Sequence, residues 1–188
     1  MVIAMDFFNP RPEGNFFTDK VLKWITDVVV IVAIACFFAI YLCEETTVVG
    51  SSMAASLEDG QVVLINKISY KLGSPERFDV IVYKSKTNEE QYVIKRIIGL
   101  PGETVKIQDS KIYINGEAIE DKYFKGNYES GQAENEIKLL DGEYFVMGDN
   151  RNLSEDSRFD YIGNIYKDDI VGKAWLIASP FSEINFVN

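Results

Sequence analysis

Residues 50–57 read GSSMAASL and residues 92–102 read YVIKRIIGLPG, and we expect the chain to be organised so that the second segment folds back onto the first. The 188-residue chain contains no histidine, so no imidazole can activate a serine here and a Ser/His/Asp triad is excluded. Lysine is the remaining base, and serine with lysine is a known variant of this chemistry. We therefore predict that Ser52 is a nucleophile and that Lys95 is its general base.

The surroundings of Lys95 follow from strand periodicity. Along a strand, Val93, Lys95 and Ile97 share one face, which places the lysine among apolar side chains. A lysine acts as a base only when neutral, so its usual pKa of ~10.4 must fall by about 2 to 3 units, and burial is the usual cause. Taken alone, the strand pattern favours the alternative of an ordinary surface lysine. Arg96, the next residue, is expected to need a carboxylate partner.

One apolar run stands out from an otherwise ordinary globular composition. It extends over 16 uncharged residues, Val28–Cys43, and Trp24–Thr26 lengthen it toward the ~20 residues of a membrane span. We predict a transmembrane helix over residues 24–43. A cleaved signal peptide is the main alternative, but the run lies late in the chain and no small-residue cleavage site follows Tyr41 and Leu42. A buried core helix is the second alternative.

Charges on either side of this run predict its orientation. Arg11, Lys20 and Lys23 precede it, whereas Glu44 and Glu45 follow it directly. Because positively charged flanks stay inside, the amino terminus is expected in the cytoplasm and the chain in the cell membrane as a single-pass protein. The predicted parts are a cytoplasmic segment, a transmembrane helix and an extracytoplasmic catalytic domain on the outer face: residues 1–23, 24–43 and 44–188.

The composition of the outer domain excludes several classes of partner. The whole chain has a net charge of −10, and residues 44–188 contain 16 basic and 25 acidic residues, which argues against nucleic acid. Cys36 and Cys43 both lie in the apolar run, so the domain is expected to lack a disulfide. With no histidine, and no cysteine outside the run, we expect no metal site. The acyl-enzyme chemistry predicted for Ser52 and Lys95 is expected to need no cofactor.

Short β-branched and apolar runs predict a mainly β domain, in which no stretch has helical periodicity for more than two turns. Thr46–Val49 is expected to be a strand that leads directly to Gly50 and Ser52. The further strands are expected at Gln61–Ile68, Phe78–Tyr83, Tyr92–Ile98, Glu143–Met147 and Ile170–Ala178.

Two other segments of this domain have a recognisable character. Lys111–Ile114 and Glu117–Ile119 are expected to form a hairpin, because Asn115-Gly116 supplies the positive φ angles of a type I′ turn. The polar segment Asp121–Glu136 is expected to be an exposed insertion. We therefore predict mostly antiparallel strands on a membrane stalk.

A third segment, residues 147–158, reads MGDNRNLSEDSR, and by itself it predicts only a solvated loop. Together the three segments resemble the type I signal peptidases, the membrane-bound serine peptidases that remove signal peptides from exported preproteins. The motifs that carry the resemblance are Ser52-Met53, Lys95-Arg96 followed by Gly99, Pro101 and Gly102, and Gly148–Arg158. The short, single-span Gram-positive members are the most similar. The resemblance implies an antiparallel, barrel-like β domain on one N-terminal transmembrane helix.

The resemblance also implies roles for individual residues. Ser52 would attack the scissile carbonyl, and Lys95 would accept its proton and return one to the leaving amine. Ser154 matches the serine that hydrogen-bonds and orients the lysine. The oxyanion would be held by the Ser52 N–H with help from around Gly50, where some relatives have a serine hydroxyl. Four further residues match structural groups near the site: an Asp156–Arg158 ion pair, with Asp149 and Arg151 stabilising the same loop.

The implied substrate is an exported preprotein with small residues at the first and third positions before the cut. It would bind as an added β-strand, and shallow apolar pockets would exclude larger side chains. Membrane lipid and nearby secretion machinery are the other expected partners. The positions that match the pockets are Val48, Met53, Leu57 and Ile94.

One departure from the family pattern keeps an alternative function open. Ala55 and Ser56 replace the usual proline and threonine, and Ala55 would leave the turn less rigid than proline does. Restoring proline is therefore expected to change rate or thermal stability. The alternative is a catalytically silent relative that binds or chaperones an exported protein such as a pilin. It is disfavoured because Ser52 and Lys95 are both present. A self-cleaving, repressor-like Ser/Lys peptidase is disfavoured by the predicted span and by the lack of a DNA-binding segment.

Overall fold

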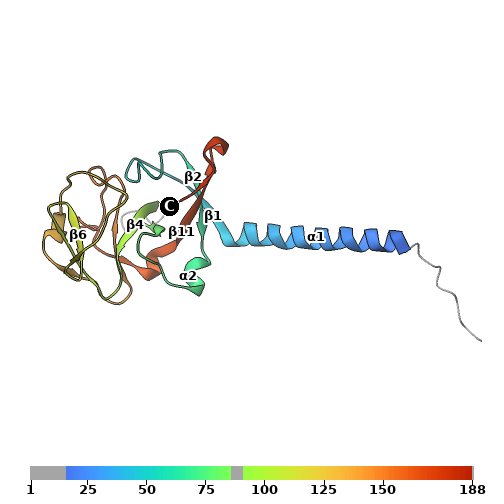
Figure 1. Cartoon of the computed structure of the whole chain (residues 1–188), viewed down its shortest axis with the longest axis horizontal. Coiled ribbons are helices and arrows are strands. Elements are labelled where there is room, and N and C mark those ends of the chain that lie inside the picture. Colours follow the sequence, from blue (N-terminus) through green and yellow to red (C-terminus); the bar gives the residue numbers. More distant parts are fainter. Residues whose placement is uncertain (1–15, 86–90, 188) are drawn as a thin grey trace, which may run out of the picture. The chain divides into compact units, whose positions relative to one another are not determined.

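The computed structural model describes residues 16–85 and 91–187, and for residues 16–18 and 38–43 it describes the backbone alone. The chain divides into two compact units, Met1–Tyr41 and Leu42–Asn188. The long helix α1 (Phe16–Leu42) makes up the described part of the first unit (Figure 1). Among the described residues, no helix combines the length and the apolar character that a membrane crossing requires. The span predicted over residues 24–43 thus stays a prediction, and residues 1–15 of the expected cytoplasmic segment lie outside the described chain.

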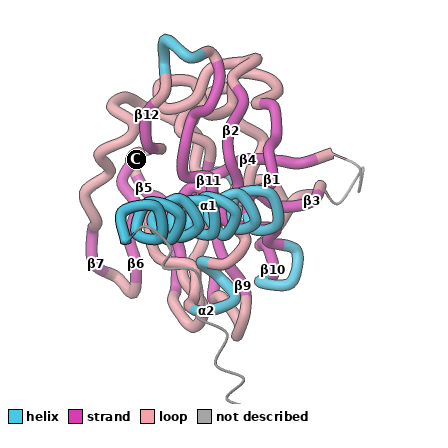
Figure 2. The backbone as a smooth tube through the Cα atoms, turned by 90° about the vertical axis from the view of Figure 1, so that its right-hand side faces the viewer, coloured by secondary structure: helices cyan, strands magenta, loops and turns pink. Residues whose placement is uncertain are grey.

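The second unit consists of two antiparallel sheets with short helical turns between the strands (Figure 2). The larger sheet has the order β1 (Cys43–Thr47), β2 (Val62–Asn66), β11 (Ile170–Ser179), β3 (Val80–Lys84), β4 (Tyr92–Gly99), β9 (Glu143–Met147) and β10 (Ile165–Tyr166), with β12 (Asn185–Phe186) paired to β11. The smaller sheet has the order β7 (Glu117–Ala118), β6 (Lys111–Ile114), β5 (Thr104–Gln108) and β8 (Ile137–Lys138). The helical turns are α2 (Ser69–Leu72), η1 (Gly131–Glu134), η2 (Lys167–Asp169) and η3 (Phe181–Glu183).

The predicted mainly β, antiparallel fold is confirmed, and the larger sheet explains how the two key segments meet. β4 is a central strand between β3 and β9, and its successive residues point to opposite faces of the sheet and pack in different apolar clusters. Ile94 packs in the cluster that contains Val48 and Met53, whereas Ile97 packs in another. The pairing path is open, since no described strand joins β1 to β10.

The predicted hairpin is confirmed. Asn115 has φ +52° and Gly116 has φ +84°, the left-handed values that a type I′ turn requires, and β6 pairs with β7 on either side of them. Other predicted strands have the expected positions within a few residues.

Two sequence predictions about local structure need correction. The strand expected at Thr46–Val49 is β1, Cys43–Thr47, so the chain leaves the strand before Val48. The segment Asp121–Glu136 is not simply an exposed insertion, because Tyr128 and Ala133 pack inside the cluster around the smaller sheet. The polar composition of the segment gave no indication that Tyr128 and Ala133 are buried. The strand β5 of the same sheet was not predicted.

Candidate active site

The turn that holds Ser52 is fixed by backbone bonds and by two buried side chains. Ala54 N donates to Ser51 O at 3.0 Å, and Leu57 N donates to Met53 O at 2.9 Å. Met53 and Leu57 are fully buried in the core, so the apolar side chains of the motif anchor the turn from below. Ser52, between these contacts, is half-buried.

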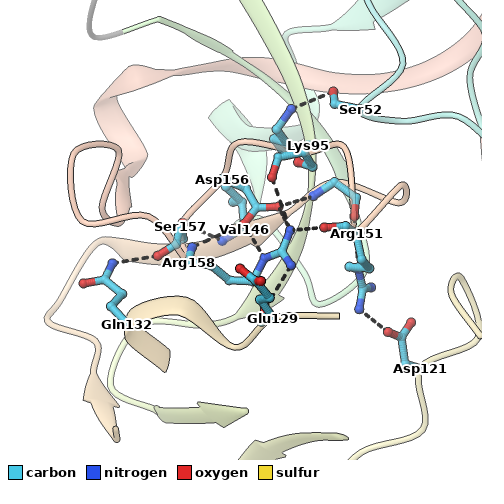
Figure 3. A network of polar contacts seen from close by, with 12 residues as sticks. Ser52, Lys95, Asp121, Glu129, Gln132, Val146, Arg151, Asp156, Ser157 and Arg158 are labelled. Atoms are coloured by element: carbon cyan, nitrogen blue, oxygen red, sulfur yellow. Dashed lines mark hydrogen bonds and ion pairs between the residues drawn. The ribbon is translucent and has the colours of Figure 1, made fainter. Parts of the chain in front are cut away.

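Lys95 reaches Ser52 from the middle of β4. Its Nζ donates a hydrogen bond to Ser52 Oγ at 2.7 Å, across 43 residues of sequence. Only 3% of Lys95 is exposed, and its backbone pairs with Ile81 of β3. Figure 3 shows the lysine directed at Ser52, with the charged network of Asp156, Arg158 and Arg151 on the other side of it. The surface-lysine alternative is therefore wrong.

The electrostatics of the site favour a neutral lysine. Burial lowers the pKa of Lys95 from 10.5 to about 8, against the opposing effect of nearby carboxylates, of which Asp156 is the largest. Because the side chain has no ion-pair partner among the described residues, desolvation prevails. A substantial fraction of Lys95 is then uncharged slightly above neutral pH, as a general base requires.

The expected Asp156–Arg158 ion pair is present on the far side of Lys95 (Figure 3). Arg158 Nε lies 2.8 Å from Asp156 Oδ1, and Asp156 Oδ2 accepts the Gly148 N–H at 2.9 Å. Arg158 also donates to the Arg151 carbonyl at 2.6 Å. These bonds tie the two ends of the loop together beneath the dyad.

Asp149 and Arg151 stabilise the loop through partners that the sequence did not reveal. Asp149 binds both Nε and Nη2 of Arg96 in a fully buried ion pair, at 2.7 and 2.6 Å, which supplies the carboxylate expected for Arg96. Arg151 pairs with Asp121, and the ring of Tyr123 lies 3.5 Å from the Arg96 guanidinium carbon. Asp121 and Tyr123 both come from the supposed insertion. The aromatic residues of this segment are unusual for a solvated loop, and they were the sequence feature that could have indicated its packing against the site.

Ser154 differs from its predicted contact. The side chain is buried, but its Oγ makes no hydrogen bond among the described residues, so the expected bond to Lys95 is absent. A Cβ added to Gly148 would lie 2.2 Å from Ser154 Oγ and 2.4 Å from the Ser52 carbonyl oxygen. Asn150 N donates to the same carbonyl at 3.0 Å. Gly148 therefore lets the loop pack directly on the turn that holds Ser52.

The turn also contains the two residues expected on the oxyanion side, Ser52 and Gly50. Gly50 has φ +81°, and its N–H donates to Asp59 Oδ1 at 2.7 Å, so this N–H is already bonded. The Ser52 N–H donates to no described group. Of the two expected contributors, the Ser52 N–H is the one free to bind an oxyanion.

A cleft of about 460 Å³ opens beside the dyad. Three of the four predicted pocket residues, Val48, Met53 and Ile94, line it. Leu57 does not, because it is fully buried in the core cluster behind them. The other lining residues are Val49, Gly50, Ser51, Ser52, Tyr83, Ser85, Gln91, Tyr92, Val93, Lys95, Leu153, Glu155, Tyr161, Ile162 and Ile165.

The pair Ala55-Ser56, which replaces the usual proline and threonine, has a definite conformation. Ala55 has φ +99°, whereas a proline ring holds φ near −65°, so proline at this position requires a different turn. The lower rigidity expected for this turn stays a prediction. Ser56 Oγ accepts a bond from Arg96 Nη2 at 3.3 Å, which uses the hydroxyl that threonine would also supply.

In the part of the chain that the structure describes, no group of three or more His, Cys, Asp or Glu side chains is arranged to hold a metal ion.

Comparison with known proteins agrees with this geometry. The family described as "Signal peptidase, peptidase S26" matches residues 21–178. This chain belongs to that family. Signal peptidase I T of Bacillus subtilis (strain 168) is 36% identical over 175 residues, which cover 89% of this chain and 90% of that protein. Signal peptidase IB of Staphylococcus aureus (strain MRSA252) is 32% identical over 183 residues, covering 89% and 94%.

A solved structure, that of a signal peptidase I from Enterococcus faecalis V583, is 36% identical and covers 53% of this chain and 95% of that one, with a TM-score of 0.45.

Proposed function

We propose that this signal peptidase family member is a serine endopeptidase that removes signal peptides from exported preproteins by using Ser52 and Lys95. The observation that carries the proposal is the 2.7 Å contact between Ser52 Oγ and the buried Nζ of Lys95. A lysine held without a counter-ion beside a serine hydroxyl is an arrangement suited to proton transfer.

Acylation follows from this contact. Neutral Lys95 accepts the Ser52 Oγ proton while Oγ bonds to the scissile carbonyl carbon, and the resulting oxyanion is bound by the Ser52 N–H. The ammonium of Lys95 then gives its proton to the leaving amine, the C–N bond breaks, and an ester on Ser52 remains. In deacylation a water molecule gives a proton to Lys95 as its oxygen attacks the ester, and Ser52 Oγ recovers a proton as it leaves.

Supporting residues act through the dyad. Ser154 is proposed as a positioning residue, because its unpaired, buried hydroxyl lies in the loop that packs on the nucleophile's turn. Asp149, Arg151, Asp156 and Arg158 are proposed to hold that loop in place. Gly50 is proposed to shape the oxyanion site through its left-handed backbone rather than as a donor.

Small substrate residues before the cut are proposed because three apolar side chains line the cleft. Val48, Met53 and Ile94 are nearly fully buried, so they form an apolar floor that core packing holds in place. Leu57 supports this floor from the core. An extended substrate segment is proposed to lie on it with small side chains at the first and third positions before the cut.

The chain is proposed to be a single-pass protein of the cell membrane, with its amino terminus in the cytoplasm and its β domain on the outer face. The described side chains of α1, residues 19–37, are exposed and largely apolar, and Lys20 and Lys23 precede the uncharged run. Membrane lipid would then be a partner, and the secretion machinery a neighbour. Protease added outside intact spheroplasts should remove the β domain; protection of that domain would contradict this orientation.

The function is tested by cleavage of a preprotein with an Ala-x-Ala site, using the full-length chain in detergent. The parent should cleave at that site, whereas Ser52→Ala and Lys95→Met should each lose at least about a thousandfold in rate, as single members of catalytic units do. Preprotein binding by both variants shows that they are folded. Binding without cleavage by the parent would instead support the silent binding protein.

A further inference from the structure

The cleft contains one acidic side chain among its described lining residues, Glu155. Lys95 is the other charged lining residue, but it is buried and its Nζ is bonded to Ser52. Glu155 is exposed and forms no ion pair in the described part of the chain. Among the described lining residues, the accessible charge is therefore negative.

Neighbouring carboxylates differ from Glu155 in this respect. Asp149 and Asp156, in the same loop, are fully buried and each binds an arginine. Their charges are neutralised within the protein and are closed to substrate. Of these three carboxylates, Glu155 is the one that a bound peptide can reach.

The loop holds Glu155 in a fixed place. Ser154 before it and Asp156 after it are both buried, and Asp156 is bonded to the Gly148 N–H as well as to Arg158. Tyr161, from the same connection, lines the cleft with Glu155. A carboxylate supported in this way does not need to be ordered from a mobile loop when substrate binds.

Glu155 lines the same cleft as Ser52 and Lys95, with Leu153 from the same connection. Under the proposed function, the first and third substrate residues before the cut are small. A long charged side chain that reaches Glu155 is therefore expected from another position near the cut, and the first two positions after it carry no such size limit.

We propose that Glu155 is a specificity-determining residue that favours exported proteins with a lysine or arginine at the first or second position after the cut. The inference rests on the proposed function and adds a charge preference on the leaving-group side. An ion pair at an exposed site is worth little, so the preference is expected to be about two- to fivefold in kcat/KM and to weaken at high salt.

The test uses one preprotein with an Ala-x-Ala site, in which each of the first two positions after the cut is in turn Lys, Gln or Glu. The parent should cleave the Lys form about two- to fivefold better than the Gln form, at one position at least. Glu155→Gln should bring this ratio to one, and Glu155→Lys should favour the Glu form. Because Glu155 also affects the pKa of Lys95, only ratios between substrates within one variant are compared.

Glu117→Gln is the matched control, because Glu117 is an exposed acid on β7 that does not line the cleft. It should keep the parent's ratio. A parent that cleaves all forms equally, or a Glu155→Gln variant that keeps the preference, overturns the inference alone. A parent that cleaves none of the forms contradicts the proposed function, and the inference falls with it.

Discussion

The two faces of β4 hold adjacent cations in opposite ways. Arg96 is fully buried and meets Asp149 through two bonds, as well as the Phe78 carbonyl and Ser56 Oγ. Lys95, one residue earlier and almost equally buried, has Ser52 Oγ as its hydrogen-bond partner. A buried cation with a carboxylate stays charged and stabilises structure, whereas one without a carboxylate tends to lose its proton. From this difference we infer a structural role for Arg96 and the proposed chemical role for Lys95.

Removing the carboxylate that pairs with Arg96 should have the largest effect on stability. Asp149→Asn leaves the guanidinium buried without its counter-charge, which typically costs about 3 to 5 kcal/mol. The free energy of unfolding, measured by urea denaturation of the full chain in detergent, should fall by that amount. Glu117→Gln, which removes an exposed charge of the same sign, should change it by less than about 0.5 kcal/mol. Equal effects of the two substitutions would show that the buried pair is not special.

Replacing Lys95 should change the free energy of unfolding in the opposite direction. A lysine with a folded pKa of about 8 and an ordinary value of 10.5 favours the neutral form, so its charge destabilises the folded state fully below pH 8 and not at all well above pH 10.5. Lys95→Met removes that cost. Its stability relative to the parent should be greater at pH 7 than at pH 10 by roughly 2 to 3 kcal/mol.

Thermal or urea unfolding of both proteins at the two pH values measures this difference. Lys173→Met is the control, because Lys173 has an ion-pair partner in Asp79. A pH-independent difference between Lys95→Met and the parent would mean that Lys95 is not titrating at a lowered pKa.

The smallest effect concerns the turn that brings Ser52 to the lysine. Ala55 has φ +99° and an exposed side chain, so Ala55→Gly should relieve strain and stabilise the protein by up to about 1 kcal/mol. Ala55→Pro should destabilise it. Ala54→Gly, next to it but without a positive φ, should be neutral or destabilising by comparison. Stabilisation by proline at position 55 would show that the turn is misassigned.

Much of this comparison could be predicted from sequence. Strand alternation placed Lys95 among apolar neighbours, and the lack of histidine made a lysine base necessary. The need of Arg96 for a carboxylate was also foreseeable, although its partner was not. Asp149 follows a different strand, and the pairing depends on sheet order, which local pattern does not contain.

Other features depended on tertiary packing. Asp121 and Tyr123 lie in a segment whose polar composition indicates a loop, and only the docking of its aromatic residues brings them to the arginines. The left-handed φ of Ala55 is invisible to sequence because alanine rarely adopts it. Leu57 was assigned to the substrate pocket because it matches a pocket position of the family. In the structure it packs in the core cluster with the residues that line the cleft.

The most direct test of the central claim is the pH dependence of kcat/KM for a preprotein substrate, because this ratio reports the pKa of the essential base in the free enzyme. If burial holds Lys95 neutral beside Ser52, the rate should rise with pH and reach half its maximum near pH 8. Glu155→Gln removes a carboxylate that raises the pKa of Lys95 and should move this midpoint to lower pH. A midpoint near 10.5, or a rate independent of pH between 6 and 10, would contradict the assignment of Lys95 as the base.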